Sequence, residues 1–290
     1  MSSFLQFLSA GLTMGAIYAL VAIGFVLIYN ASDAVNFAQG EFVMLGGMAT
    51  VFAAKAGLPL PLAMAAAVAG TVATGLALYV FAVRPARGAS AVSLIIITIG
   101  ASIFLRGLAS IGFDKNIHNL PEYVSADAIT LGGASIRPQS LLVLAGTALI
   151  VCALFVFLRR SLTGKAVLAT AANRDAAKLV GIDTDRTIAL SFAVSGAIGA
   201  VGGLLITPIA LTSYDVGAPL ALKGFTAAVL GGLGHPVGAV AGGLLLGLLE
   251  SLGAGYLSSQ YKDAIAFVLL LATLIFMPNG LFGRGGTDRV

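Results

Sequence analysis

The 290-residue chain has one cysteine, no tryptophan and few charged side chains. A single Cys152 excludes a disulfide within the chain and a metal site built from several cysteines. Without tryptophan, an aromatic belt at a membrane interface must come from tyrosine. Charged residues make up 10% of the chain, whereas soluble domains carry about 25%. So few charges could not cover the surface of a soluble domain in which 59% of the residues are hydrophobic.

Hydrophobic runs recur along the whole chain. A helix needs about 20 apolar residues to cross a hydrocarbon core of about 30 Å, and the mean hydropathy of +1.02 agrees with many such helices. The candidate spans are 4–29, 38–54, 59–83, 92–112, 139–158, 187–211, 236–256 and 261–277. A ninth apolar segment, 221–233, is too short for an upright crossing and is expected to be a broken or re-entrant helix. We predict an all-α fold, a polytopic transmembrane helix bundle of about eight full spans plus this short segment, in a single domain over 1–290.

Lysine and arginine are concentrated in the stretch 159–186, in the turn after the third span and in the C-terminal tail, which together hold ten of the sixteen basic residues. Basic residues favour cytoplasmic loops, so these regions are expected in the cytoplasm and the loop 113–138 outside it. Counting spans places the N-terminus outside. The C-terminus is then cytoplasmic, provided that 221–233 crosses the membrane.

The stretch 159–186 is too polar to span and is expected to form two short helices that meet at Asn173. Asparagine is favoured at helix N-caps, and Asp175 in the first turn suits the helix dipole. Gly181 can adopt the left-handed conformation that ends a helix. The pattern predicts a capped surface helix over 174–180 that could dock in a groove of a partner protein. A solvated connecting loop is the alternative.

Six segments between about residue 11 and residue 283 resemble permease subunits of branched-chain amino-acid type ABC importers, in order and at fitting spacings. They are Gly-Ala-Ile-Tyr-Ala-Leu (15–20), Asn-Phe-Ala-Gln-Gly-Glu-Phe (36–42), Arg-Pro-Ala-Arg-Gly-Ala-Ser (84–90), Gly-Lys-Ala with Asn-Arg-Asp-Ala-Ala and Leu-Val-Gly-Ile (164–166, 173–177 and 179–182), Leu-Lys-Gly-Phe-Thr-Ala-Ala-Val-Leu-Gly-Gly-Leu-Gly (222–234) and Pro-Asn-Gly-Leu-Phe-Gly (278–283). Two positions depart from the family pattern: Leu168 replaces a frequent arginine and Gln39 a frequent histidine.

The resemblance implies the permease subunit of an ATP-driven, binding-protein-dependent importer that moves branched-chain amino acids or related small solutes by alternating access. The implied partners are a second related permease, two ATP-binding cassette subunits and a periplasmic or extracellular substrate-binding protein, in a bacterial inner membrane. The sequence contains no Gly-x-x-x-x-Gly-Lys-[Ser/Thr] motif. ATP and Mg²⁺ are therefore expected on the partner subunits, with no cofactor, metal or catalytic residue on this chain.

Two groups of residues follow as candidates for function. Residues expected to couple the chain to the ATPase are Gly164, Lys165, Asn173, Arg174, Asp175, Ala176, Leu179 and Gly181. Among these, Lys165, Arg174 and Asp175 are expected to make polar contacts to the ATPase. Polar groups in lipid are costly and rare, so the candidates for the translocation pathway are Tyr18, Asn36, Gln39, Glu41, Tyr214 and Lys223. The alternative is that these residues pair with one another or with helix ends and hold the bundle together.

The short segment adds one expectation about the substrate. Lys223 stands near its start, where a helix N-terminus at membrane depth would attract a carboxylate. Whether the solute is a branched-chain amino acid, urea, an amide or an aromatic acid is left open, as is whether the permease pairs with itself or with a different chain.

Two other classes of function remain as alternatives. A stand-alone carrier or channel would have the same composition, but it does not need a capped cytoplasmic helix. An intramembrane enzyme would need Ser195 and His235 within hydrogen-bonding reach of each other. The two residues are expected at different depths in the membrane, which argues against this reading.

Overall fold

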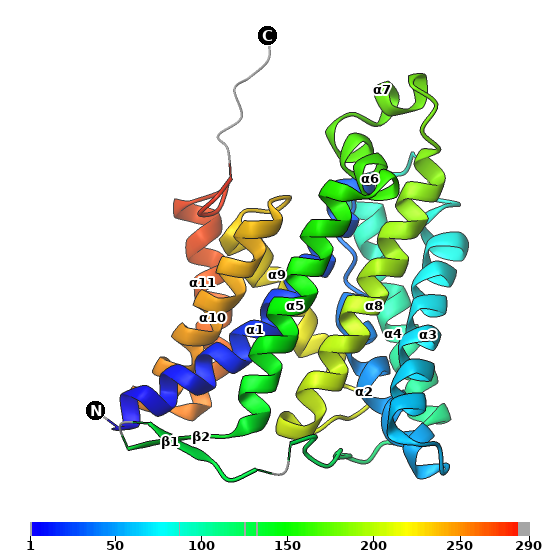
Figure 1. The fold of residues 1–290 in the computed structure, drawn as a ribbon. Coiled ribbons are helices and arrows are strands. Elements are labelled where there is room, and N and C mark those ends of the chain that lie inside the picture. Colours follow the sequence, from blue (N-terminus) through cyan, green and yellow to red (C-terminus); the bar gives the residue numbers. More distant parts are fainter. Residues whose placement is uncertain (1, 87, 125, 132, 284–290) are drawn as a thin grey trace.

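The computed structural model describes residues 2–86, 88–124, 126–131 and 133–283, and over these residues the chain is a bundle of helices with a small hairpin at one end (Figure 1). The all-α prediction is confirmed. The elements are α1 (Ser2–Ser32), α2 (Gln39–Lys55), α3 (Leu60–Leu78), the π-helical turn η1 (Tyr79–Val83), α4 (Ala91–Gly112), β1 (Ile129–Leu131), β2 (Ala134–Ile136), α5 (Pro138–Arg160), α6 (Leu162–Ala172), α7 (Arg174–Leu179), α8 (Thr184–Ala210), α9 (Gly217–Gly231), α10 (Pro236–Tyr256), η2 (Ser259–Tyr261) and α11 (Lys262–Phe276). The basic residues Arg87, Arg284 and Arg289 lie outside the described part of the chain.

Seven helices of the described residues are long and apolar enough to cross a membrane, namely α1, α3 continued by η1, α4, α5, α8, α10 and α11 with η2. Two helices inside the bundle are shorter than these seven: α2 has 17 residues and α9 has 15. At 1.5 Å per residue these two reach about 25 Å and about 22 Å, less than a hydrocarbon core of about 30 Å. The segment expected as a full span at 38–54 is thus one of two short helices.

The other short helix, α9, begins earlier than the sequence predicted. It starts at Gly217, so that Pro219 lies in the first helical turn. Proline is tolerated there because the N–H it lacks would have no partner within the helix. It ends before Gly232, whose φ of 105° suits only glycine. Lys223 therefore lies in the second turn of α9, and the expectation that it stands at a helix N-terminus is wrong.

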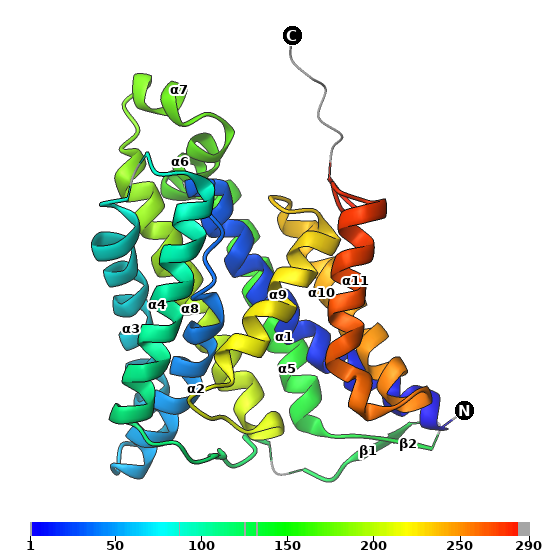
Figure 2. The same ribbon diagram turned by 180° about the vertical axis from the view of Figure 1, so that it is seen from behind.

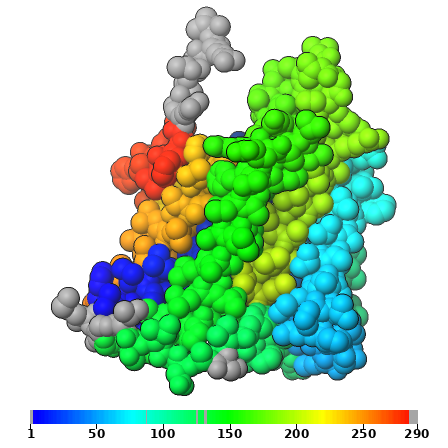
Figure 3. Space-filling model, in the orientation of Figure 1, coloured from blue at the N-terminus to red at the C-terminus, as the bar shows by residue number. Residues whose placement is uncertain are grey.

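The centre of the bundle is α1, whose most apolar window is 89% buried. On the face shown in Figure 3, the other helices hide most of α1, and only its N-terminal part is broadly visible at the lower left. Two pairs of glycines allow this burial: Gly11 and Gly15 on α1 face Gly243 and Gly247 on α10, and a Cβ at Gly247 would overlap the backbone of Gly15. Small residues four apart let helix backbones approach closely in membranes.

The molecule has two distinct ends (Figures 1 and 2). The N-terminal end of α1 and the hairpin of β1 and β2 lie at one end, and α6, α7 and the last turn of α11 lie at the other. The hairpin pairs Ile129 with Ile136 and Leu131 with Ala134. Successive helices run in opposite directions between the two ends (Figure 2). The short helices α2 and α9 lie among the longer helices, inside the bundle.

Candidate functional site

The helices α6 and α7 form a projection at one end of the bundle, which we call the knob (residues 161–183). Ser161 caps α6, because its Oγ accepts a hydrogen bond of 2.8 Å from the Gly164 N–H. Asn173 caps α7 in the same way, with 2.9 Å from the Ala176 N–H to its Oδ1. Gly181 follows the last turn with a φ of 85°. The prediction of two short helices meeting at Asn173 is confirmed.

The knob exposes apolar side chains at its tip. Leu179 is 89% exposed and Val180 is 76% exposed, although water-exposed helices usually present polar residues outward. Lys165, Asp175 and Ala176 are also exposed. Gly164 is buried against α5, so closely that a Cβ at this position would overlap the Phe157 carbonyl. The knob is therefore packed on α5 at its base and presents an apolar tip to its surroundings.

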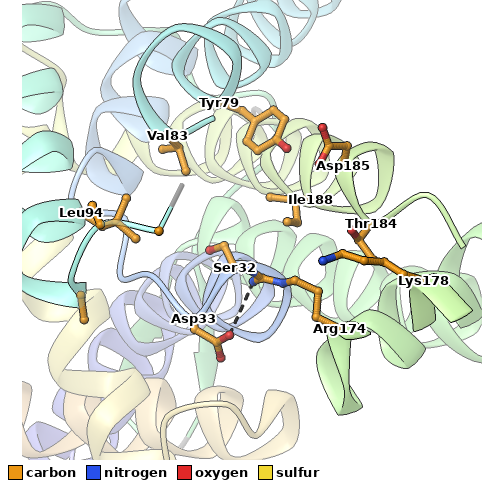
Figure 4. A pocket seen from close by; sticks show the side chains of 13 residues that line it. Ser32, Asp33, Tyr79, Val83, Leu94, Arg174, Lys178, Thr184, Asp185 and Ile188 are labelled. Carbon is orange, nitrogen blue, oxygen red and sulfur yellow. Dashed lines mark ion pairs between the residues drawn. The ribbon is translucent and has the colours of Figure 1, made fainter. Parts of the chain in front are cut away.

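Arg174 differs from the other coupling candidates because its guanidinium group turns inward (Figure 4). Its Nη2 donates a hydrogen bond of 2.9 Å to the carbonyl oxygen of Ala31, in the last turn of α1. The same nitrogen lies 3.5 Å from Asp33 Oδ2. Arg174 lines a cavity of about 440 Å³ that lies between α7 and the membrane helices. The Arg174 side chain therefore contacts the end of the membrane helix α1 and the residue that follows it.

The segment 33–38 joins α1 to α2 without being helical, and we call it the α1–α2 link. Asp33 begins it with a φ of 54°, in the left-handed region. Within the link, the side chain of the fully buried Asn36 accepts a hydrogen bond of 3.2 Å from the Ala38 N–H. The Phe37 N–H donates to Thr98 Oγ1 on α4 at 3.2 Å. Side-chain hydrogen bonds thus replace the helical ladder in this segment.

Gln39 continues this network into the core. Ser195 Oγ on α8 donates to Gln39 Oε1 at 2.5 Å and also lies 3.0 Å from the Gly24 carbonyl of α1. The Gln39 Nε2 donates to the Ser195 carbonyl at 3.3 Å. These bonds join α1, α2 and α8 at a fully buried point. His235 serves elsewhere as the N-cap of α10, accepting from the Gly238 N–H at 3.1 Å, so Ser195 and His235 form no catalytic pair.

Glu41 is fully buried in the first turn of α2. Its Oε1 accepts hydrogen bonds from Ser102 Oγ at 2.8 Å and from Arg106 Nη2 at 3.1 Å, both on α4. Its Oε2 has no hydrogen-bond partner among the described residues and faces the first residue of α9, since a Cβ on Gly217 would overlap it. The N-terminal end of α9, where a substrate carboxylate was expected to bind, is occupied by a carboxylate of the protein itself.

Lys223 forms a second charge cluster between α9, α10 and α11, in which Glu250 is fully buried and Asp263 is exposed. Its Nζ lies 2.5 Å from Glu250 Oε1 and 2.7 Å from Asp263 Oδ1. It also lies 5.6 Å from the ring centroid of Tyr18 on α1, a cation–π distance. The buried Tyr18 hydroxyl and Glu250 Oε2 have no hydrogen-bond partner in the part of the chain that the structure describes.

The six pathway candidates are therefore not one site. Asn36, Gln39 and Glu41 lie together along the link and the start of α2, and Tyr18 lies with Lys223. Tyr214 is half-buried between α8 and α9, against the cluster of Met44, Met48 and Ala109. Ser102 binds Glu41 and Ser195 binds Gln39, and neither partner could be identified from the sequence because the residues of each pair lie 61 and 156 positions apart.

The loop 113–138 is fastened to the opposite end of the bundle. His118 Nδ1 lies 2.8 Å from the Lys55 ammonium, which can only donate, so His118 Nε2 donates to Asp114 Oδ1 at 2.7 Å. The hydrogen bond from His118 holds the pKa of Asp114 below its usual range. Further along the loop, the Tyr123 hydroxyl donates to the Leu204 carbonyl of α8 at 2.9 Å.

The long apolar helices, the two short interior helices beside buried charges and the projecting knob define a polytopic membrane protein. A family model described as the permease component of a branched-chain amino acid transport system matches residues 7–274. The chain belongs to this family.

Individual relatives agree with the family match over most of their length. The chain is 36% identical over 301 residues to the high-affinity branched-chain amino acid transport system permease proteins BraD of Pseudomonas aeruginosa and LivH of Escherichia coli, with 99% of this chain and 98% of each relative covered. A probable branched-chain amino acid transport permease protein LivH of Methanocaldococcus jannaschii is 28% identical over 285 residues.

Among solved structures, a chain of PsaBC from Streptococcus pneumoniae in complex with Fab has the same fold, with a TM-score of 0.53 over 96% of this chain and 94% of that chain, at 12% identity. Family membership confirms the permease reading over the stand-alone carrier or channel and the intramembrane enzyme. The chain is a membrane component of a transport system that has other components.

Proposed function

We propose that this chain is the permease subunit of an ATP-driven, binding-protein-dependent importer for branched-chain amino acids or related small solutes. The substrate class is taken from the names of its full-length relatives. The observation that carries the proposal is the knob, a capped pair of helices whose apolar tip at Leu179 and Val180 projects from the bundle. Burying these apolar side chains against a partner protein would remove apolar surface from water, which is favourable.

In this proposal the knob docks in a groove of an ATP-binding cassette subunit. Two such subunits would carry ATP and Mg²⁺ and drive alternating access, and a second permease, identical or related, would complete the pathway. A substrate-binding protein would dock at the opposite end, at the fastened loop 113–138. Tyr18, Asn36, Gln39, Glu41, Tyr214 and Lys223 remain our candidates for the pathway. The buried pairing of most of them favours a weak solute site, which suffices when a binding protein supplies the affinity.

We place the knob end in the cytoplasm of a bacterial inner membrane. In the part of the chain that the structure describes, the basic residues at that end are Arg84, Arg159, Arg160, Lys165, Arg174, Lys178 and Arg186. Basic residues at the opposite end are fewer, and excess Lys and Arg favour the cytoplasmic side. With this orientation the N-terminus is extracytoplasmic and the end of α11 is cytoplasmic.

Uptake of labelled leucine tests the proposal. Cells would carry the permease with the products of its neighbouring genes, either intact or with an ATP-binding subunit inactivated in its Walker A lysine. We expect uptake that disappears with the inactive subunit. Uptake that survives would refute an ATP-driven importer. If neither strain takes up leucine, labelled urea, amides and aromatic acids are tested in the same pair of strains.

The docking contact has its own test. We expect Leu179→Asp to abolish co-purification of the ATP-binding subunits, because a carboxylate would have to enter an apolar groove. Arg186→Ala serves as the matched control, since Arg186 lies at the same end and, among the described residues, forms its ion pair with the nearby Asp183 at 2.9 Å. Retention of the subunits by Leu179→Asp would refute docking through this tip.

A further inference from the structure

We propose that Arg174 carries the motion of the knob into the membrane through the α1–α2 link, and that it is a positioning residue inside the permease with no contact to the ATPase. This inference rests on the proposed function. It replaces the expectation, drawn from sequence, that Arg174 faces the ATP-binding subunit.

The first observation is the direction of the side chain. Arg174 is the first residue of α7 and points away from the exposed tip, toward the end of α1 (Figure 4). It reaches the Ala31 carbonyl at 2.9 Å and the Asp33 carboxylate at 3.5 Å. Charge-assisted hydrogen bonds of this kind are stronger than neutral ones. Among the hydrogen bonds of the described residues, this is the one that joins α7 to α1.

The second observation is the space beneath α7. The cavity of about 440 Å³ is walled by the end of α1, by η1, by the start of α4 and by α7 and α8, with Ser32, Leu94 and Ile188 among its lining residues. The cavity lies between α7 and the ends of α1, η1 and α4, whereas α7 itself packs on α6 and on the start of α8. The arginine side chain makes the connection to α1, and the cavity leaves α7 room to shift.

The third observation concerns the end of α1 and the α1–α2 link, which Arg174 contacts. Ala31 is fully buried in the last turn of α1, and the chain leaves the helix directly after it, with Asp33 in the left-handed region. From there the link runs into the buried network of Gln39 and then to Glu41 at the start of α2. Because the link is held by side-chain hydrogen bonds and not by a helical ladder, a displacement at Ala31 is passed to α2 without unwinding a helix.

The three observations give one route from the knob to the membrane interior. A shift of α7, imposed by an ATP-binding subunit at the apolar tip, moves Arg174. Arg174 pulls on the end of α1 and on Asp33, and the link moves the N-terminal end of α2. The start of α2 adjoins the start of α9 at Glu41 and Gly217, so both short helices receive the displacement.

The test uses the complete transporter in proteoliposomes, with three measurements on each variant: co-purified ATP-binding subunits, ATP hydrolysis stimulated by the binding protein, and leucine uptake. We expect Arg174→Ala to keep the ATP-binding subunits and to lower uptake per ATP hydrolysed about tenfold, the scale of one lost hydrogen bond to a charged group. Leu179→Asp should lose the subunits, and Arg186→Ala should behave as the unaltered protein.

A second variant guards against misfolding of the first. Asp33→Asn removes the negative charge that faces Arg174, keeps a residue type that tolerates the left-handed conformation at this position, and leaves the knob unchanged. We expect a smaller loss of uptake per ATP hydrolysed, because the bond from Arg174 to the Ala31 carbonyl remains. An arginine that served only to contact the ATPase would not make transport sensitive to Asp33.

Each outcome decides a separate question. Loss of the ATP-binding subunits in Arg174→Ala, as in Leu179→Asp, would mean that Arg174 contacts the ATPase and would overturn the inference. Unchanged uptake per ATP hydrolysed in both Arg174→Ala and Asp33→Asn would overturn it as well. If the unaltered permease binds no ATP-binding subunits at all, the proposed function fails, and the inference fails with it.

Discussion

Removal of the buried Glu41 carboxylate isolates a positive charge in the membrane domain. In Glu41→Ala, the guanidinium group of Arg106 loses the carboxylate that lies 3.1 Å away. Breaking a buried ion pair on one side costs about 3–5 kcal/mol, since the remaining charge is uncompensated. The Arg106 side chain is 30% exposed, so we expect the lower limit, about 3 kcal/mol, after allowing for screening of an incompletely buried group.

The magnitude is measured by unfolding purified permease in mixed micelles with increasing dodecyl sulfate and following the fraction folded. A loss of about 3 kcal/mol lowers the folding equilibrium constant about a hundredfold. Glu41→Gln should lose less, because an amide oxygen still accepts the hydrogen bond from Ser102, whose present length is 2.8 Å.

A double-mutant cycle with Arg106→Met separates the ion pair from other effects of the substitution. Replacing both charges by apolar groups leaves none unpaired, so we expect the double variant to regain much of the stability lost in Glu41→Ala. Residues in direct contact show interaction energies of about 0.5–3 kcal/mol. An interaction energy below about 0.5 kcal/mol would refute the assignment of Arg106 as the partner of Glu41.

Three further predictions concern packing and the fastened loop. Gly247→Ala forces a Cβ onto the backbone of α1 and should lower the free energy of unfolding by about 1–3 kcal/mol, whereas Gly107→Ala meets nothing within 4 Å and should not lower it, but leave it unchanged or raise it by up to about 1 kcal/mol through the helix preference of alanine. Tyr123→Phe removes a hydrogen bond to a carbonyl of α8, which should cost about 1 kcal/mol and speed hydrogen exchange in the loop 113–138. Because His118 lowers the pKa of Asp114, the stabilisation from Asp114 is complete above the ordinary aspartate pKa of about 3.9 and is lost as the pH falls through the lowered value. Acid should therefore speed exchange in the loop more in the unaltered protein than in Asp114→Asn.

Each of these predictions has a result that contradicts it. Equal unfolding free energies for Gly247→Ala and Gly107→Ala would contradict the close approach of α1 and α10. Unchanged exchange in Tyr123→Phe would show that its hydroxyl does not hold the loop. The same acid-induced increase in Asp114→Asn as in the unaltered protein would show that another group governs the loop at low pH.

Features that depend on neighbouring residues could be predicted from the sequence. Hydrophobic runs located the long helices because the thickness of the membrane fixes their length. The ends of α6 and α7 followed from Asn173 and Gly181, since caps and left-handed turns are set within a few positions. The start of α9 was missed because the apolar run itself begins later than the helix. The sequence alone does not show whether a turn holding Pro219 is helical.

Partners in the site depend on contacts that the sequence does not encode locally. Lys223 and Glu250 are 27 positions apart and Gln39 and Ser195 are 156 apart, so neither pair could be read from spacing. The inward direction of Arg174 was missed for the same reason, because its acceptor at Ala31 is 143 positions earlier. The sequence identified which residues are unusual, and the fold determines what each one touches.

The central burial of α1 also has a consequence for biogenesis. The first span of this sequence to be synthesised is the one that ends most enclosed, and its Asn30 side chain bonds a carbonyl at Gly234, 204 positions later. Lipid tails are as apolar as the surface of the helix. Exposure of α1 to lipid until α10 is synthesised therefore costs little free energy. The core therefore closes only when the C-terminal helices have been inserted. A chain that stops before α10 leaves the glycine face of α1 without the backbone that covers it in the complete bundle.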